Sequence, residues 1–304
     1  MKKILLLIAA LMLLASCNSQ MEQNEVQPNS EMSNLAELSE SLQNYNSLFI
    51  TSPSAIAYDS SLRGFWGWIG KIGRVIASDA VGAIVGSTRG GVVGSIVVGV
   101  SASVGAIIGL QNVSHDGSLY MYTFSIDSSG FSAEEIEKLD EANDIGYLHN
   151  ATIYNLFNTN PNILNYSDSE VRQALFNIFT DTEKIPELKK INYYFSHQDK
   201  ENILSQFQLG QDVAKKIVDD ELISKSDFIK TISQSASISR EEAQILADYC
   251  IVVSQMDNID EISNYAQGYN EIVLKSNTSD RVKCMIMNFT SVATNSRLLW
   301  SNML

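Results

Sequence analysis

Histidine is scarce in this sequence, and its scarcity limits the chemistry the protein can perform. The three histidines, His115, His149 and His197, form neither His-Glu-x-x-His nor any Cys/His spacing of a common zinc site. We therefore expect no metal and no cofactor. The absence of a recognisable catalytic motif also favours a protein that is not an enzyme.

Basic residues are in deficit as well. The chain has 35 acidic against 21 basic residues and a formal net charge of −14. Phosphate contacts need clustered Lys and Arg, so general nucleic-acid binding is excluded. The charge is also segregated: residues 60–110 carry a local excess of basic residues, whereas residues 111–304 hold 28 acidic and 15 basic ones.

The first seventeen residues form an export signal. Lys2 and Lys3 precede the apolar run Ile4 to Leu14, and Leu14-Ala15-Ser16-Cys17 closes it. This arrangement resembles the bacterial lipoprotein signal, whose lipobox reads Leu-small-small-Cys. The resemblance implies cleavage after residue 16, acyl chains such as palmitate on Cys17, and a lipid-anchored protein of the cell envelope, at the outer membrane.

Composition divides the rest of the chain into four parts. Residues 17–33 are polar and predict a flexible tether. Residues 34–63 predict a short helix and a linker, 64–110 form a glycine-rich apolar segment, and 111–304 form an acidic helical domain. Once Cys17 carries lipid, Cys250 and Cys284 remain, and they are either a disulfide or two buried free thiols.

Small residues recur at helical spacing in the glycine-rich segment. The first register runs without interruption at a spacing of four residues, and a second register follows it. Their members are Ser78, Gly82, Gly86, Gly90 and Gly94, then Ser101, Gly105 and Gly109. Each glycine inside a helix costs about 1 kcal/mol relative to alanine, so some interaction must offset several of them. Close helix packing is the obvious candidate, either in a hairpin that turns near Ser87–Gly91 or between protomers.

Three interpretations of residues 64–110 remain open: a hairpin packed against the helical domain, a membrane-inserted or membrane-lying element, and a self-association surface. Gly90 to Leu110 is uncharged and about 30 Å long as a helix, which is enough to span a bilayer. Val75–Leu110 resembles the glycine-zipper regions of small bacterial envelope lipoproteins, where paired glycine-rich helices follow a lipid-modified cysteine.

The C-terminal region predicts a helical bundle. Residues 118–126 alternate imperfectly and predict one extended stretch. Ser132 with Glu135 and Ser239 with Glu242 fit capping boxes. Further helices are expected near 168–180, 186–206, 211–222, 226–235, 257–275 and 280–300. The expected fold class is mainly α: a glycine-rich helical hairpin followed by an acidic helical bundle, with at most a minor extended or β element.

One short constellation bears functional side chains, namely Asp144, Gly146, His149 and Asn150. Gly-x-x-His-Asn resembles a pattern in uncharacterised secreted bacterial proteins that also carry glycine-rich stretches and a terminal aromatic such as Trp300, and no activity comes with it. His149 beside Asp144 fits a general base or a metal ligand. The alternative interpretation is that His149 and Asn150 only form hydrogen bonds that hold helix ends together.

The leading functional hypothesis is a non-enzymatic, lipid-anchored envelope protein of binding or assembly type. Its glycine-rich helices mediate membrane association or self-assembly into a homo-oligomer, and its acidic domain binds an unknown protein partner. The alternatives are a membrane-active, toxin-like protein that inserts residues 64–110, and a hydrolase or metal-dependent enzyme centred on His149.

Overall fold

A computed structural model describes residues 28–50, 65–110, 119, 121–180, 200–218 and 224–301. The signal segment and Cys17 lie outside this range. Within it every regular element is a helix, which confirms the mainly α fold. The helices are α2 (Pro28–Asn46), α4 (Phe65–Gly109), α5 (Ala133–Thr159), η1 (Ile163–Asn165), α6 (Asp168–Thr180), α8 (Lys200–Val218), α9 (Lys225–Ala236), α10 (Arg240–Ser254), α11 (Ile259–Lys275) and α12 (Asp280–Trp300).

Local sequence signals explain where several helices begin. Ser132 and Glu135 form the expected capping box at the start of α5, and Ser239 and Glu242 form the second one at α10. In each box the serine side chain accepts a bond from a backbone N–H that has no partner inside the helix, and the glutamate returns the bond. Both caps are therefore confirmed.

Two expected boundaries are wrong. The helices expected over 186–206 and 211–222 are a single helix where they are described, because α8 runs unbroken through Gly210. Gly210 faces another helix at close range and does not end its own. The expected tether over 17–33 is too long, since α2 already begins at Pro28.

The glycine-rich segment is a helical hairpin. Two glycines inside α4 leave helical geometry at its middle, Gly90 with φ −151° and Gly91 with φ +57°. The left-handed φ of Gly91 suits a residue without a side chain. The break divides α4 into a first arm before Gly90 and a second arm after Gly91, and it falls where the sequence predicts the turn.

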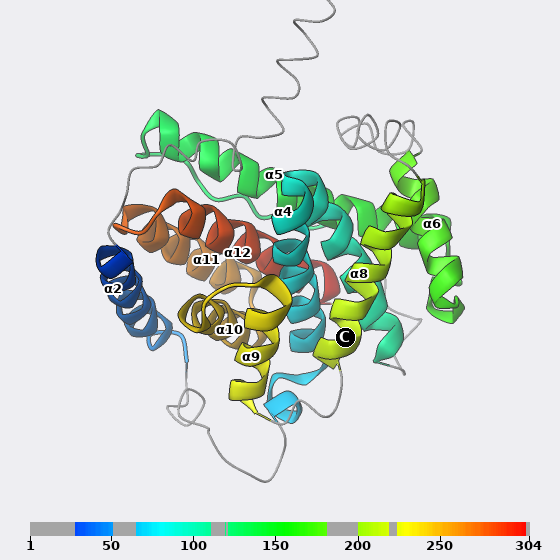
Figure 1. The fold of residues 1–304 in the computed structure, drawn as a ribbon, viewed down its shortest axis with the longest axis horizontal. Helices are drawn as coiled ribbons and strands as arrows, with labels where there is room; N and C mark the ends of the chain where they lie inside the picture. Colours follow the sequence, from blue (N-terminus) through cyan, green and yellow to red (C-terminus); the bar gives the residue numbers. More distant parts are fainter. Residues whose placement is uncertain are drawn as a thin grey trace, which may run out of the picture.

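This hairpin lies in the core of the helical domain. Figure 1 shows α4 through the middle of the molecule, with α8 and α6 on one side and α11 and α12 on the other, and α4 contacts α8, α12, α5, α10 and α9. The first arm is buried from Val75 to Gly86, and the second from Val93 to Val104. The segment is thus the centre of the domain that follows it in the sequence.

The C-terminal helix α12 is the other central element. It is buried almost throughout and packs against α4, α5, α10 and α11. Three aromatic rings from α10 and α11 pack together: Tyr249 stacks on Tyr265 and meets Tyr269 edge to face. The Tyr249 hydroxyl lies 2.6 Å from Oγ1 of Thr294 in α12. The core is therefore continuous from the hairpin to α11.

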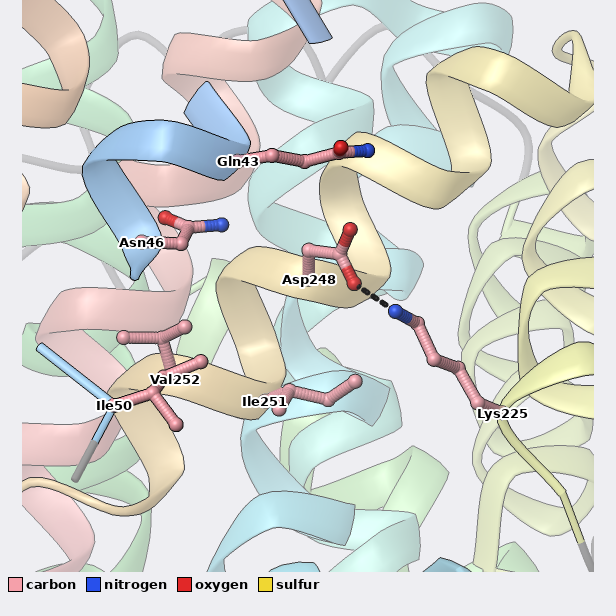
Figure 2. A pocket seen from close by; sticks show the side chains of 7 residues that line it. All are labelled: Gln43, Asn46, Ile50, Lys225, Asp248, Ile251 and Val252. Atoms are coloured by element: carbon pink, nitrogen blue, oxygen red, sulfur yellow. Dashed lines mark ion pairs between the residues drawn. The ribbon is translucent and has the colours of Figure 1, made fainter. Parts of the chain in front are cut away.

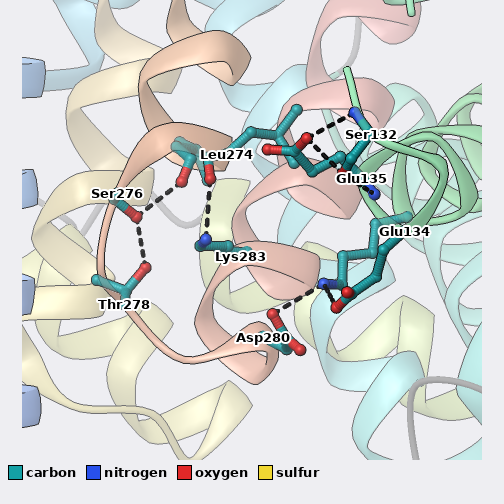
Figure 3. A network of polar contacts seen from close by, with 10 residues as sticks. Ser132, Glu134, Glu135, Leu274, Ser276, Thr278, Asp280 and Lys283 are labelled. Carbon is teal, nitrogen blue, oxygen red and sulfur yellow. Dashed lines mark hydrogen bonds and ion pairs between the residues drawn. The ribbon is translucent and has the colours of Figure 1, made fainter.

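Polar contacts at the surface join the ends of distant helices. Figure 3 shows the start of α5 beside the turn between α11 and α12, where Lys138 Nζ lies 2.9 Å from both Glu134 and Asp280. Lys283 Nζ donates to the backbone oxygen of Leu274 at 2.8 Å. On the other side of that turn, Asn34 of α2 donates to the backbone oxygen of Asn277 at 2.7 Å.

Candidate functional site

The first small-residue register forms the seam inside the hairpin. A Cβ added to Gly86 would lie 2.0 Å from the backbone oxygen of Gly94, and a Cβ on Gly94 would lie 2.2 Å from that of Gly86. A Cβ on Gly82 would lie 2.7 Å from Cβ of Ala102. Real Cβ atoms do not approach other atoms so closely, so only glycine allows the two arms to meet here.

The second register forms a seam with α8. A Cβ on Gly105 would lie 3.1 Å from Cβ of Ala214, and one on Gly109 would lie 3.2 Å from Val218. From the opposite side, a Cβ on Gly210 of α8 would lie 2.6 Å from Cβ of Ser101. The two registers therefore have two different partners, both within one chain.

Two members of the first register, Gly90 and Ser78, do not form part of the seam between the two arms. Gly90 belongs to the turn, and a Cβ there would meet nothing within 4 Å. Ser78 is fully buried, and its hydroxyl donates to the backbone oxygen of Arg74, one turn earlier in the same helix, at 2.8 Å. Spacing alone does not separate these two residues from Gly82, Gly86 and Gly94.

Asp79, in the first arm of the hairpin, is the centre of a buried polar cluster. Its carboxyl group is fully buried and accepts a hydrogen bond from Oγ of Ser296 in α12. Burial raises its pKa to about 8, while hydrogen bonding from Ser296, Ser103 and Trp300 acts in the opposite direction. Asp79 is therefore mostly protonated at neutral pH.

His149 approaches the same carboxyl group from α5. Its Nε2 lies 3.8 Å from Oδ2 of Asp79, and neither side chain is exposed. Burial lowers the pKa of His149 to about 4. Its Nδ1 lies 3.2 Å from Oδ1 of Asn150, and because an amide oxygen only accepts, Nδ1 carries the ring proton. The Asp79–His149 pair is thus uncharged at neutral pH.

Several polar atoms around this pair are buried without a well-formed hydrogen bond. They are Asp79 Oδ1, His149 Nε2, Ser103 Oγ and Trp300 Nε1. Ser103 and Trp300 lie close enough to Asp79 to lower its pKa, although neither completes a hydrogen bond to it. A charge on either member of the pair would have neither solvent nor a counter-charge, so the cluster depends on neutrality.

The Asp144, Gly146, His149 and Asn150 constellation divides between two faces of α5. Asp144 is exposed and His149 is fully buried, so the histidine meets Asp79 in place of Asp144. Gly146 lets α12 come close, since a Cβ there would lie 2.3 Å from Oγ of Ser291. This geometry fits the interpretation in which His149 and Asn150 form hydrogen bonds between helices, because His149 has no exposed surface at which a substrate could react.

The remaining candidates are groups of metal-ligating side chains and the two C-terminal cysteines. In the described ranges no group of three His, Cys, Asp or Glu side chains has the geometry to hold a metal ion. Cys250 and Cys284 are buried and are not joined by a disulfide, so of the two alternatives the structure has the buried thiols. Burial raises the pKa of the Cys250 thiol, and nearby Asp79 adds to that effect.

A small surface cleft between α2, α9 and α10 is a second candidate. Figure 2 shows Lys225 reaching Asp248 across it, with Ile251 and Val252 along its wall. Lys225 and Asp248 form an ion pair, and Asp248 accepts a further bond from Gln244 at 2.8 Å. The two charged groups that line this cleft are therefore already paired with each other.

Sequence reasoning missed the part that Asp79 plays. The available signal was its position, as the single acidic residue between Lys71 and Leu110 in an apolar helix. Comparison with protein families, curated proteins and solved structures gives no match for this chain. The features of this chain that bear on function are therefore the buried hairpin and the polar cluster around Asp79.

Proposed function

We propose that the protein is a non-enzymatic, lipid-anchored envelope protein whose apolar hairpin α4 is kept in the domain core until it enters a bilayer. The observation that carries the proposal is the division of the two glycine seams. The seam at Gly86 and Gly94 joins the two arms to each other, so it survives if the hairpin leaves the domain as a unit. Only the contacts with surrounding helices must break.

The composition of α4 supports a bilayer as its destination. Within Gly70–Gly109, the most apolar stretch of 18 residues has a mean hydropathy of 2.1, and the length and composition of the helix suffice to cross a membrane, although 78% of that stretch is buried inside the domain. The core helix of a soluble protein has these properties as well. A lipid chain on Cys17, implied by the lipobox, would also favour insertion, because it holds the domain beside a membrane.

The positions of the charged residues in the hairpin are also compatible with insertion into a bilayer. Lys71 and Arg74 stand near the start of the first arm and Arg89 near the turn, where their charges reach headgroups. The second arm carries no charge. Asp79 lies inside the first arm, and it would have to enter the bilayer in its protonated form, because an ionised carboxylate is costly there.

Displacing α8 would expose the second small-residue register, Ser101, Gly105 and Gly109. Such a register promotes close helix packing in lipid, so a second copy of the hairpin becomes its partner. One movement of α8 therefore accounts for both membrane association and self-assembly. The acidic helices, which an anionic surface repels, would stay outside the bilayer.

A reversible lock between α4 and α8 tests the proposal. Gly105→Cys with Ala214→Cys places the two Cβ atoms about 3.1 Å apart, within a few tenths of an ångström of disulfide geometry. The lipidated protein is mixed with phosphatidylethanolamine and phosphatidylglycerol vesicles that contain a carbene-generating lipid probe. We expect labelling of residues 92–109 in the reduced protein and its loss when the disulfide forms.

The single variant Gly105→Cys, oxidised in the same way, controls for the substitution itself. It should be labelled as strongly as the native protein. Equal labelling of the locked and reduced double variants would contradict the proposal, and so would a complete absence of label from α4 in the native protein.

The same hairpin favours a second function, a membrane-active, toxin-like protein. This function requires the inserted hairpin to make the bilayer permeable. Dye release from anionic vesicles, suppressed by salt and by the α4–α8 lock, would support it. Labelling of α4 without dye release would support the anchoring and assembly role instead.

A further inference from the structure

Residues 121–127 belong to no helix, and the described part of the chain places no strand beside them. Phe124 and Ile126 are buried, whereas Thr123, Ser125 and Asp127 are exposed. This alternation is that of a strand with one face against a core. The segment lies on helices, so its backbone groups need partners that no neighbouring strand supplies.

Side-chain amides supply those partners at the two buried positions. The N–H of Phe124 donates to Oδ1 of Asn295 at 2.9 Å, and Nδ2 of Asn295 donates back to the oxygen of Phe124 at 3.2 Å. Asn143 does the same for Ile126, at 2.9 and 3.3 Å. Each amide thus replaces the peptide group of a neighbouring strand.

The pattern continues at both ends of the segment. Asp127 exchanges two bonds with the amide of Gln267 in α11, at 2.8 and 3.3 Å. Nδ2 of Asn150 donates to the oxygen of Tyr122 at 3.3 Å. The four amides, on α5, α11 and α12, define what we call the amide groove: Asn143, Asn150, Gln267 and Asn295.

Three of these amides are held in place by contacts of their own, and the first of these contacts is from Nε2 of Gln267 to Oε1 of Glu271 at 3.0 Å. Nδ2 of Asn295 also donates to the backbone oxygen of Ser291 at 2.9 Å, and Nδ2 of Asn150 donates to the backbone oxygen of Asn295 at 2.8 Å. Gly146 brings α5 and α12 together at this level. The groove is therefore preorganised by helix contacts that do not involve the segment.

The chemistry of recognition follows from these contacts. The amides read only backbone N–H and C=O groups, so they accept any extended peptide that has free N–H groups at the positions of Phe124, Ile126 and Asp127. Selectivity comes from the two buried side chains, an aromatic residue and, two residues later, an aliphatic one. Proline is excluded at the three paired positions.

We propose that the amide groove is a peptide-recognition site, and that an extended aromatic-x-aliphatic segment of a partner protein takes the place of residues 121–127 in it. The resident segment is the template for that partner, because its backbone bonds and two buried side chains show what the groove accepts. This inference does not rest on the membrane role of α4. It gives a defined site to the partner binding expected of the acidic domain.

A synthetic peptide of residues 119–128 with a fluorescent label tests the site by anisotropy. The resident segment competes with it at a high effective concentration, so the native protein should bind the peptide weakly. Phe124→Ala with Ile126→Ala in the full chain loosens the competitor and should tighten peptide binding by at least about tenfold. Circular dichroism establishes that this variant stays helical.

A matched peptide, methylated on the backbone nitrogens of the residues equivalent to Phe124 and Ile126, keeps the side chains and loses the donors. It should bind the loosened variant at least about tenfold more weakly than the unmodified peptide. Adding Gln267→Ala to the loosened variant should weaken binding by a few-fold, because it removes a bidentate contact at the rim of the groove. If the double variant does not fold, Ile126→Ala alone replaces it.

Absence of peptide binding by a folded, loosened variant would overturn the proposal. So would equal affinity for the methylated and unmodified peptides, since it would show that the backbone is not being read. Neither result depends on vesicles, so this test fails or succeeds separately from that of the hairpin.

Discussion

Oδ2 of Asp79 and Nε2 of His149 lie 3.8 Å apart in the interior, one from the hairpin and the other from α5. Burial moves their pKa values in opposite directions, to about 8 for Asp79 and about 4 for His149. Near neutrality the folded pair therefore shares one proton and has no charge, which is what a site without solvent requires.

The first prediction concerns the pH dependence of stability. Between pH 4 and 6.5 the folded pair holds one proton, on Asp79, and the unfolded pair also holds one, on His149, so the pair adds no slope. From pH 6.5 to 8 the unfolded state loses its proton and the folded state keeps it. The free energy of unfolding should fall by about 2 kcal/mol over that interval, since one proton contributes about 1.4 kcal/mol per pH unit.

Asp79→Asn should remove this fall in the free energy of unfolding between pH 6.5 and 8. The folded variant then holds no proton on the pair, so it should instead lose stability as pH falls below the ordinary pKa of 6.5 for His149. Asp144→Asn removes an exposed acid from α5 and should keep the native profile. Urea unfolding at several pH values measures all three proteins, and identical slopes for native protein and Asp79→Asn would refute the neutral pair.

The second prediction separates two glycines of one register. Gly86→Ala places a Cβ 2.0 Å from a backbone oxygen, and it should destabilise the domain by about 3 kcal/mol or prevent folding. Gly90→Ala places its Cβ in open space and should change stability by less than about 1 kcal/mol. Thermal unfolding of the two variants compares them directly, and equal losses would mean that the arms do not meet at Gly86.

The third prediction concerns the crossing of α5 and α12. Gly146→Ala forces a Cβ to 2.3 Å from Oγ of Ser291 and should cost about 2 kcal/mol. Adding Ser291→Ala removes the clashing hydroxyl and should restore part of the loss. Chemical denaturation measures both variants; a double variant no more stable than the single one would show that the hydroxyl is not the obstacle.

The fourth prediction concerns the thiols. Cys250 and Cys284 are buried thiols that form no disulfide, so neither should react with iodoacetamide in the folded protein, and both should be alkylated after unfolding without a reductant. Intact mass spectrometry counts the added groups. A requirement for reductant before alkylation would reveal a disulfide.

Local signals were enough to predict the helical class, the two capping boxes and the turn of the hairpin. Spacing also identified the small residues that pack closely. It did not identify their partners, because a ridge of small residues has the same period whether it faces its own hairpin or α8. That is why Gly90 and Gly86 are alike in sequence and differ in the fold.

The site was harder to predict than the elements. His149 and Asp144 are close in sequence, but a separation of five residues puts them on different sides of a helix, and the acid that meets His149 comes from 70 residues earlier. Similarly, the role of Asn150 depends on α12 and on the segment at Tyr122. Such contacts follow from tertiary packing, which a local pattern does not contain.

Hydrogen–deuterium exchange of the lipidated protein, with and without anionic vesicles, tests the central claim most directly. The account predicts that vesicles reduce the protection of the α8 amides from exchange while the α4 amides stay protected, because lipid then surrounds the hairpin in place of α8. If α4 and α8 keep the same protection with vesicles as without them, the hairpin is only a structural core and the proposed membrane role is wrong.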